Sequence, residues 1–296
     1  MVEEKPSRGR QSTFTETKEL LRRFNIKALK GLGQHFLVDR SVLRRMVSAA
    51  DLLPSDIVVE IGPGLGILTE ELVRSAGKVI AIEVDSKMAF TLAERFSHVP
   101  KLTIINADVL KLDTVELIMK HASECSYPQD YKVVANLPYN IAAPVLRRFL
   151  EASLKPNRMV VMVQKEVGQS MVAAPGRMGL LSLSIQLYGK PTIVGYVPAR
   201  SFYPKPKVNS AIVRIDIHQK TAVEVEDIAS FFTVVKAGFS APRKQLRNSL
   251  AQGMQMQAVS VVEHLKRVGI APERRPQTLS LEEWVRVCHE FTPIRE

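Results

Sequence analysis

Short apolar runs alternate with amphipathic segments between residues 40 and 215. The runs are rich in β-branched residues and lie at 57–61, 78–83, 102–106, 132–136 and 159–163. Apolar residues recur at helical spacing in the segments at 40–52, 67–75, 86–96, 113–122 and 142–152. This alternation predicts an α/β domain, with a parallel sheet covered by helices on both faces. Two later runs, 192–197 and 208–215, alternate more regularly and predict an antiparallel pair at the edge.

The pattern changes at both ends of this region. After residue 218 the strand signal disappears, and helical patterns follow at 224–238, 242–253, 257–268 and 280–292. Ser280 and Glu283 form a capping box that opens the last of these helices. We therefore predict three parts: a polar extension over 1–28 with one helical piece at 17–26, a sheet domain over 29–217, and a small helical domain over 218–296.

Composition limits the class of protein. Apolar residues make up 46% of the chain, which is enough for a packed core, and no apolar run reaches membrane-spanning length. The charged N-terminus has no apolar segment typical of a secretory signal. Cys125 and Cys288 are far apart and are not clustered with histidines, so we expect ordinary thiols and no metal site. Together these features favour a cytoplasmic protein without a membrane partner.

The net charge of +11 indicates a polyanionic partner. The excess is concentrated: 1–30 has eight basic residues against four acids, and 198–220 has five against one. A third cluster, Arg243, Lys244 and Arg247, has no acid within 237–250. Any one cluster is equally typical of a solvated surface, but several around one domain favour nucleic-acid binding.

A glycine-rich turn follows the first predicted strand. The spacing of the glycines at 62, 64 and 66 is GxGxG, which suits a tight turn from strand to helix. This spacing is less typical of dinucleotide binding than GxGxxG. Glu83 ends the next strand, where an acid can accept from ribose hydroxyls, and Asp108 ends the third, where an acid can accept from an adenine amine. Each feature alone is also typical of a structural turn or helix cap. Three at successive strand ends predict a ligand site.

The segment Asn136-Leu137-Pro138-Tyr139-Asn140 has the chemistry to hold a planar base. Asn136 offers an amide oxygen, Pro138 fixes the backbone so that the Leu137 carbonyl points one way, and Tyr139 offers a stacking face. An adenine amine is a poor nucleophile, because its lone pair is delocalised into the ring, and must be held firmly. The sequence therefore predicts a methyltransferase that acts on adenine amines.

Five ordered motifs resemble one family. GQHFL at 33–37, EIGPGLG at 60–66, NLPYN at 136–140, QKEV at 164–167 and SFYPKPKVNSAIVR at 201–214 look like the ribosomal RNA adenine dimethyltransferases, and more narrowly their KsgA type. The resemblance, over residues 27–292, implies a Rossmann-like seven-stranded methyltransferase sheet followed by a small helical domain. It implies S-adenosylmethionine as methyl donor, with S-adenosylhomocysteine as product and no metal. The implied substrate is a pair of adjacent adenines in the 3′-terminal hairpin of 16S rRNA, within the small ribosomal subunit, and we expect a monomer.

The resemblance also implies roles for individual residues. Donor contacts fall to His35, Leu37, Gly62, Gly64, Glu83, Asp108 and Asn136. The amine would be held by the Asn136 side chain and the Leu137 carbonyl, next to Pro138, with the base between Tyr139 and Phe202. Core packing is nearly as good an explanation of Phe202. Phosphate contacts are expected from Lys205, Lys207, Arg243, Lys244 and Arg247.

Two positions depart from the family pattern. His35 replaces a frequent Asn, so a backbone contact to the donor would survive there, whereas an amide contact would not. Asn209 replaces Asp, so a role that needs a carboxylate is lost. Three alternatives remain: a resistance methylase of large-subunit rRNA, a non-catalytic RNA-binding relative, and a small-molecule or DNA amine methylase. The GQHFL and SFYPKPKV segments oppose the first, the intact ligand motifs the second, and the basic helical domain the third.

Overall fold

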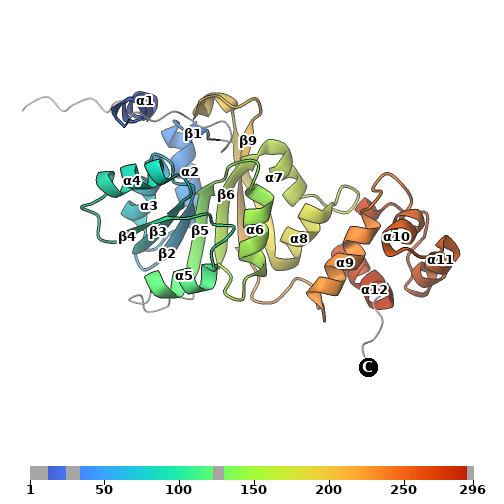
Figure 1. Ribbon diagram of the computed structural model, residues 1–296. Coiled ribbons are helices and arrows are strands. Elements are labelled where there is room, and N and C mark those ends of the chain that lie inside the picture. The colour runs from blue at the N-terminus through green and yellow to red at the C-terminus, as the bar shows by residue number, and fades with distance from the viewer. Residues whose placement is uncertain (1–12, 25–33, 123–129, 292–296) are drawn as a thin grey trace, which may run out of the picture.

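The computed structural model describes residues 13–24, 34–122 and 130–291 (Figure 1). A seven-stranded sheet with the order β4-β3-β2-β5-β6-β9-β7 forms its centre. The strands are β2 (Ile57–Ile61), β3 (Lys78–Glu83), β4 (Leu102–Asn106), β5 (Tyr131–Asn136), β6 (Arg158–Gln164), β7 (Gly189–Val197) and β9 (Ser210–Ile217). The first five are parallel, and β9 pairs antiparallel with both β6 and β7. The predicted α/β class, the strand positions and the antiparallel edge pair are all confirmed.

Helices cover both faces of the sheet because the central strands are apolar on both faces. On one face, α2 (Arg40–Ala50), α3 (Ile67–Ser75) and α4 (Ser86–Arg95) share a buried cluster with Val58 and Val134. On the other face, α5 (Thr114–His121) and α6 (Ala142–Glu151) share a second cluster with Val59 and Val133. Neighbouring residues of one strand thus enter different cores, as the two-residue period of a strand requires.

Two helices were not predicted from the sequence pattern. The QKEV motif begins α7 (Lys165–Met171), and α8 (Leu180–Tyr188) follows it. Leu183, Ile185 and Leu187 of α8 are all buried, at alternating positions that do not form one helical stripe. A short helix with buried residues on more than one side lacks the periodicity on which the sequence analysis relied.

The N-terminal helix α1 (Thr13–Arg23) lies across a small second sheet, visible at the top of Figure 1. That sheet pairs β1 (Phe36–Leu37) with β8 (Phe202–Tyr203), which come from segments far apart in the sequence. Phe14 meets Tyr203 edge to face, with ring centroids 5.7 Å apart, and Lys18 Nζ lies 4.4 Å from the Phe14 ring centre. The helix starts four residues before the predicted piece at 17–26, whose last two residues lie outside the described ranges.

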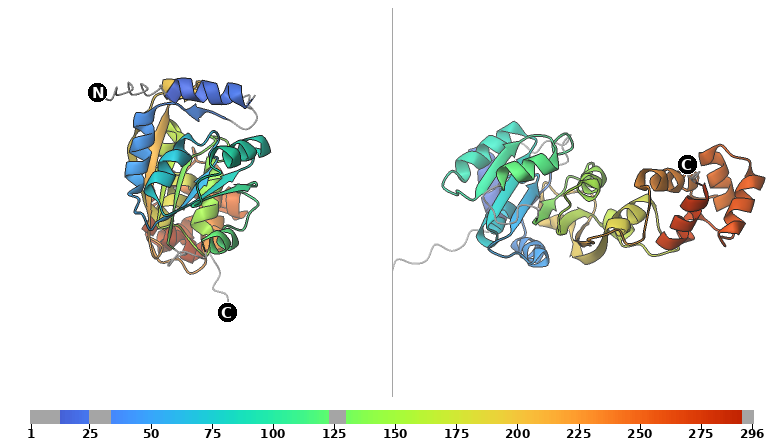
Figure 2. Two further views of the ribbon diagram at one scale, coloured as in Figure 1. Left: turned by 90° about the vertical axis from the view of Figure 1, so that its left-hand side faces the viewer. Right: turned by 90° about the horizontal axis from the view of Figure 1, so that it is seen from below.

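Over the described residues 228–291, four helices and a short 3-10 turn, η3 (Pro276–Thr278), form a C-terminal part that is set apart from the sheet in Figure 2. They are α9 (Ile228–Gly238), α10 (Leu246–Met254), α11 (Ala258–Arg267) and α12 (Leu281–Phe291). Trp284 is fully buried at their centre, and Gly238 leaves room for its ring. The capping box forms as predicted, since Ser280 Oγ accepts from the Glu283 amide at 3.2 Å.

Burial raises the pKa of the Cys288 thiol, in keeping with an ordinary buried cysteine, whereas Cys125 lies outside the described residues. None of the described helices is both long enough and apolar enough to cross a membrane.

Candidate functional site

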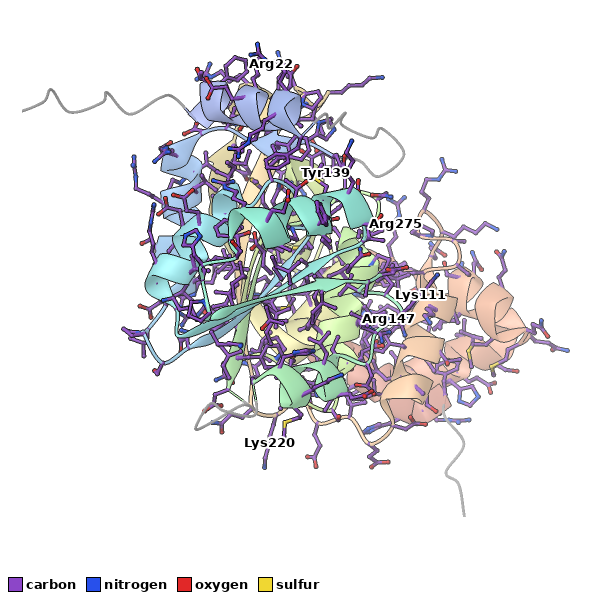
Figure 3. All side chains as sticks on the ribbon, turned by 60° about the vertical axis from the view of Figure 1, so that its left-hand side comes forward. Arg22, Lys111, Tyr139, Arg147, Lys220 and Arg275 are labelled. Carbon is purple, nitrogen blue, oxygen red and sulfur yellow. The ribbon has the colours of Figure 1, made fainter. Side chains whose placement is uncertain are left out.

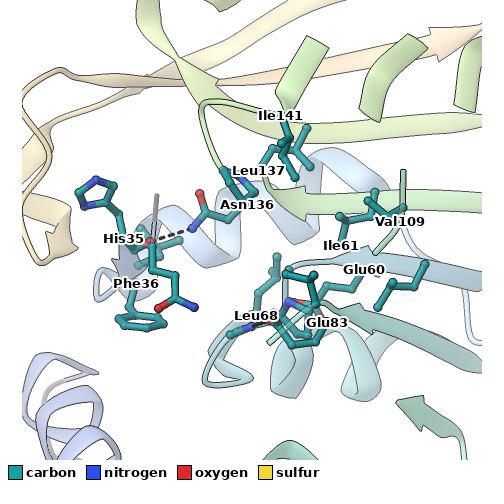
Figure 4. Close-up of a pocket in the computed structure, with 18 of the residues that line it drawn as sticks. His35, Phe36, Glu60, Ile61, Leu68, Glu83, Val109, Asn136, Leu137 and Ile141 are labelled. Carbon is teal, nitrogen blue, oxygen red and sulfur yellow. Dashed lines mark hydrogen bonds between the residues drawn. The ribbon is translucent and has the colours of Figure 1, made fainter. Parts of the chain in front are cut away.

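A cavity of about 240 Å³ opens where the carboxyl ends of β2, β3 and β5 meet (Figure 4). Parallel strands bring these ends to one edge of the sheet, so residues distant in the sequence share the cavity. Of the predicted donor and base residues, its wall contains His35, Leu37, Gly62, Gly64, Glu83, Asp108, Asn136, Leu137, Pro138 and Tyr139.

The glycine-rich turn owes its shape to positive φ angles. Gly62, Gly64 and Gly66 have φ of 65°, 57° and 79°, in the left-handed region that favours glycine. A Cβ on Gly66 would lie 2.6 Å from Leu92 and Phe96, so this glycine also permits close packing of α3 against α4. A Cβ on Gly62 would meet only Pro138, at 3.8 Å, which leaves the backbone here open to a ligand.

Glu83 holds the turn from the next strand. Its Oε2 accepts a hydrogen bond from the Gly64 amide at 3.0 Å, and its Oε1 accepts from the Asp85 amide at 3.0 Å. Burial raises the pKa of this carboxyl, and the two backbone hydrogen bonds oppose that rise. Each carboxylate oxygen keeps a second lone pair, so Glu83 can still accept two hydroxyl groups.

Asp108 lies two residues after β4, which ends at Asn106 and not at Asp108 as the sequence predicted. Its Oδ1 accepts from the Leu110 amide at 3.0 Å, and Lys111 Nζ lies 4.0 Å from its Oδ2. The side chain is 35% exposed, so the carboxylate remains open to a polar ligand group. Asp108 and Glu83 both line the cavity.

Glu60 is a wall residue that the sequence analysis did not single out. It is 1% exposed, and its Oε2 has no hydrogen-bond partner within the described part of the chain. Desolvation raises the pKa of this carboxyl to about 8; the nearby Thr69 side chain opposes the rise, and the charge of Glu83 adds to it. The signal was present in the sequence: an acid inside an otherwise apolar strand is costly to bury and often marks a site.

Asn136 ends β5 with its side chain fixed in one orientation. The Asn136 Nδ2 donates to the backbone carbonyl of His35 at 3.1 Å, drawn as a dashed line in Figure 4. Figure 4 also shows the amide oxygen turned away from this bond. The Leu137 amide donates to the Met162 carbonyl at 3.1 Å, which fixes the start of the turn. The Asn136 oxygen is therefore presented as an acceptor.

Tyr139 is held at its hydroxyl group and on one face of its ring. Its hydroxyl is 2.8 Å from Ser210 Oγ on β9, and its ring stacks on His35 with centroids 5.8 Å apart and planes inclined by 29°. Burial raises the pKa of the Tyr139 hydroxyl, although the Ser210 hydrogen bond opposes this. The ring is thus a fixed aromatic surface beside Asn136.

The two departures from the family pattern have different outcomes. Asn209 Oδ1 accepts a hydrogen bond from the Ala199 amide at 3.0 Å, so the neutral amide performs a task that a carboxylate oxygen could also perform. His35 places its backbone against Asn136, while its ring Nδ1 lies 2.7 Å from the Pro204 carbonyl oxygen.

Phe202 does not form the second face of a base site in this structure. It is 3% exposed, packs in the core cluster that contains Leu37, and is not among the described residues that line the cavity. The pairing of β8 with β1 places Phe202 opposite Leu37 and brings the next residue, Tyr203, against α1. The expectation of base stacking by Phe202 is therefore corrected to core packing.

The predicted phosphate contacts lie on exposed segments. Lys205, Lys207, Arg243 and Lys244 are exposed, whereas Arg247 is 39% exposed and lies 3.9 Å from Glu273. Because α10 begins only at Leu246, Arg243 and Lys244 belong to the preceding loop and not to the helix that the sequence predicted from 242. In the view of Figure 3, Arg22 lies on one side of Tyr139, and Lys111 and Arg275 lie on the other.

The described residues contain no group of three or more His, Cys, Asp or Glu side chains arranged to hold a metal ion.

Comparisons with known proteins agree on one relationship. The family model described as ribosomal RNA adenine dimethylase matches residues 25–292. A ribosomal RNA small subunit methyltransferase A from Dehalococcoides mccartyi strain 195 is 48% identical over 96% of this chain and 95% of its own length. A protein of the same name from Bacillus mycoides is 41% identical over 92% and 94%.

Two solved structures are similar over most of their length. The dimethyladenosine transferase from Plasmodium falciparum has a TM-score of 0.72 and 25% identity, and the match covers 87% of this chain and 97% of that one. The 23S rRNA methyltransferase ErmE has a TM-score of 0.65 and 26% identity, with 86% and 98% covered.

Proposed function

This chain belongs to the ribosomal RNA adenine dimethylase family, and we propose that it dimethylates the N6 amines of two adjacent adenines in the 3′-terminal hairpin of 16S rRNA. The methyl donor is S-adenosylmethionine. The observation that carries the proposal is the fixed pair beside the cavity: an Asn136 amide oxygen oriented by the His35 carbonyl, and the face of Tyr139.

The cavity residues fit the donor. Gly62 leaves its backbone open, Glu83 has free lone pairs for two ribose hydroxyls, and Asp108 can accept from an adenine amine. Glu60 also lines the cavity, although its buried Oε2 lacks a partner among the described residues. When bound, S-adenosylmethionine supplies a methyl group that its sulfonium already activates.

The remaining task of the protein is to position the amine. Asn136 Oδ1 and the Leu137 carbonyl would accept the two N6 hydrogens, which turns the lone pair toward the methyl group. Tyr139 would hold the base by stacking, so the adenine must be unpaired or flipped out of its helix. Holding two reactants in line can supply several kcal/mol of the barrier, about 7 or more in the best cases.

We further propose that exposed basic residues hold the small-subunit rRNA across the mouth of the cavity. Lys205 and Lys207 follow the segment that contacts His35, and Arg243 and Lys244 lie in the loop before α10. Contacts to phosphates orient RNA without reading its sequence, so the choice of adenine would rest with the base site. We propose that the protein acts as a monomer in the cytoplasm.

One experiment tests the proposed function. The protein is incubated with S-adenosylmethionine carrying a labelled methyl group and with small subunits that lack the modification, and the methylated bases are mapped. We expect label on the N6 atoms of two neighbouring adenines near the 3′ end of 16S rRNA. Naked 23S rRNA serves as the second substrate, because ErmE is a 23S rRNA methyltransferase. Label only on 23S rRNA, or on neither substrate, would refute the proposal.

A further inference from the structure

His35 makes three contacts with two separate segments of the site. Its backbone carbonyl accepts from Asn136 Nδ2 at 3.1 Å, and its ring stacks on Tyr139 at a centroid distance of 5.8 Å. Its Nδ1 lies 2.7 Å from the Pro204 carbonyl oxygen in the segment that follows β8. One residue therefore supports both the amide and the aromatic ring of the proposed base site.

The hydrogen bond to Pro204 fixes the imidazole ring. A carbonyl oxygen can only accept, so the hydrogen lies on Nδ1 of His35 and is donated to Pro204. The hydrogen bond from Nδ1 and the Tyr139 ring against its face hold the imidazole toward the Pro204 segment. Tyr203, the residue before Pro204, is in turn packed against Phe14 of α1. The ring thus belongs to a supported wall on the base side.

We propose that the His35 side chain is a positioning residue for the target base, whereas its backbone alone contributes to the donor cavity. The inference rests on the proposed function. In this arrangement the imidazole holds the Tyr139 ring in the plane on which adenine stacks. It also links that ring to the Pro204 segment, so the stacking face of Tyr139 keeps its position when RNA enters.

The second methylation of each amine depends most on this support. Each transfer forms an N–CH3 bond and breaks the S–CH3 bond, whose electron pair returns to sulfur, and one N6 proton is released to solvent. The first transfer acts on an amine with two hydrogens. Asn136 Oδ1 can accept a hydrogen bond from one of them, and the Leu137 carbonyl can accept from the other. After the first transfer, one N–H remains, so stacking on Tyr139 must supply a larger share of the orientation.

The test separates the side chain of His35 from its backbone. His35→Ala keeps the carbonyl that holds Asn136 but removes the stack and the Pro204 bond. We expect the KM for under-methylated small subunits and the ratio of N6-monomethyladenine to N6,N6-dimethyladenine each to rise about tenfold. Calorimetry should find the affinity for S-adenosylhomocysteine changed less than about twofold, because in this proposal the His35 side chain makes no direct contact with the donor.

His35→Asn is the rescue variant. Its planar amide can donate to the Pro204 carbonyl and lie against Tyr139, so the ratio of mono- to dimethylated product should return most of the way to that of the unmodified protein. The exposed His98, on the segment after α4, provides a matched control as His98→Ala, with no expected change in either measurement. Thermal unfolding of all three variants shows whether each one folds.

Two results from a folded His35→Ala variant would overturn the role of His35. Weaker S-adenosylhomocysteine binding by His35→Ala, in proportion to its loss of activity, would assign the ring to the donor site. An unchanged product ratio and KM would make the ring a bystander. If the unmodified protein methylates no adenine, the proposed function fails and not this inference alone. If His35→Ala does not fold, His35→Asn must still lie close to the unmodified protein in KM and product ratio, and a rise of about tenfold in either refutes the proposal.

Discussion

Replacing Glu60 by Gln should make the protein more stable at alkaline pH and leave its stability in mild acid almost unchanged. The carboxyl is 1% exposed, its Oε2 lacks a partner among the described residues, and burial raises its pKa from 4.5 to about 8. Folding of the native protein therefore favours the protonated form of Glu60. A glutamine keeps the shape of that neutral form but cannot ionise.

The size and sign follow from proton linkage. Between the unfolded pKa of 4.5 and the folded value of about 8, the native state holds a proton that the unfolded state has lost. The contribution of protonated Glu60 to the free energy of unfolding is fully present below pH 4.5 and is lost as the pH rises through 8. A pKa difference of this size corresponds to at most about 5 kcal/mol, of which about 3 kcal/mol would be lost between pH 5.5 and pH 8.

Urea unfolding of both proteins across this range measures the effect. The free energy of unfolding of Glu60→Gln minus that of the native protein should rise by about 3 kcal/mol between pH 5.5 and pH 8. Glu94→Gln, at an exposed position on α4, is the matched control and should show no such trend. If the free energy of unfolding changes with pH in the same way for the native protein and Glu60→Gln, the reasoning is refuted and the pKa of Glu60 lies near its ordinary value.

Three further predictions concern binding and turnover. Glu83→Gln leaves one carbonyl oxygen in place of a charged acceptor pair, so calorimetry should find S-adenosylhomocysteine binding weakened by about 1–3 kcal/mol. Asn136→Ala should reduce methyl transfer far more than donor affinity, as single-turnover assays with small subunits can show. Neutralising Arg243, Lys244 and Arg247 together should reduce the slope of log K for RNA binding against log salt by about 1.4–1.8. This corresponds to the loss of two phosphate contacts and not three, because Arg247 already lies 3.9 Å from Glu273.

Each of these has a result that contradicts it. Unchanged product affinity in folded Glu83→Gln would remove the carboxylate from the donor site. Near-normal turnover by Asn136→Ala would end its assignment to the target amine. An unchanged salt slope in filter binding would mean that the basic loop before α10 faces solvent. All three variants should keep the far-ultraviolet circular dichroism of the native protein.

The sequence alone determined the elements whose signals are local. Strands β2 to β6 are short runs of apolar, mostly β-branched residues, and their order along the chain already predicts a parallel sheet. The turn at Gly62 to Gly66 and the acid Glu83 could be recognised because a strand end has a fixed place in such a sheet. Asn136 and Tyr139 could be recognised because their functional groups act from one short segment.

Only the tertiary structure decided which side chains face the cavity and which support it. Phe202 is buried because β8 pairs with β1, a contact between segments 165 residues apart that no local pattern reveals. His35 meets Asn136, Tyr139 and Pro204 for the same reason. The raised pKa of Glu60 depends on desolvation by the whole domain. Local sequence sets backbone conformation, but burial and hydrogen-bond partners arise from packing between distant segments, and these gave the site its chemistry.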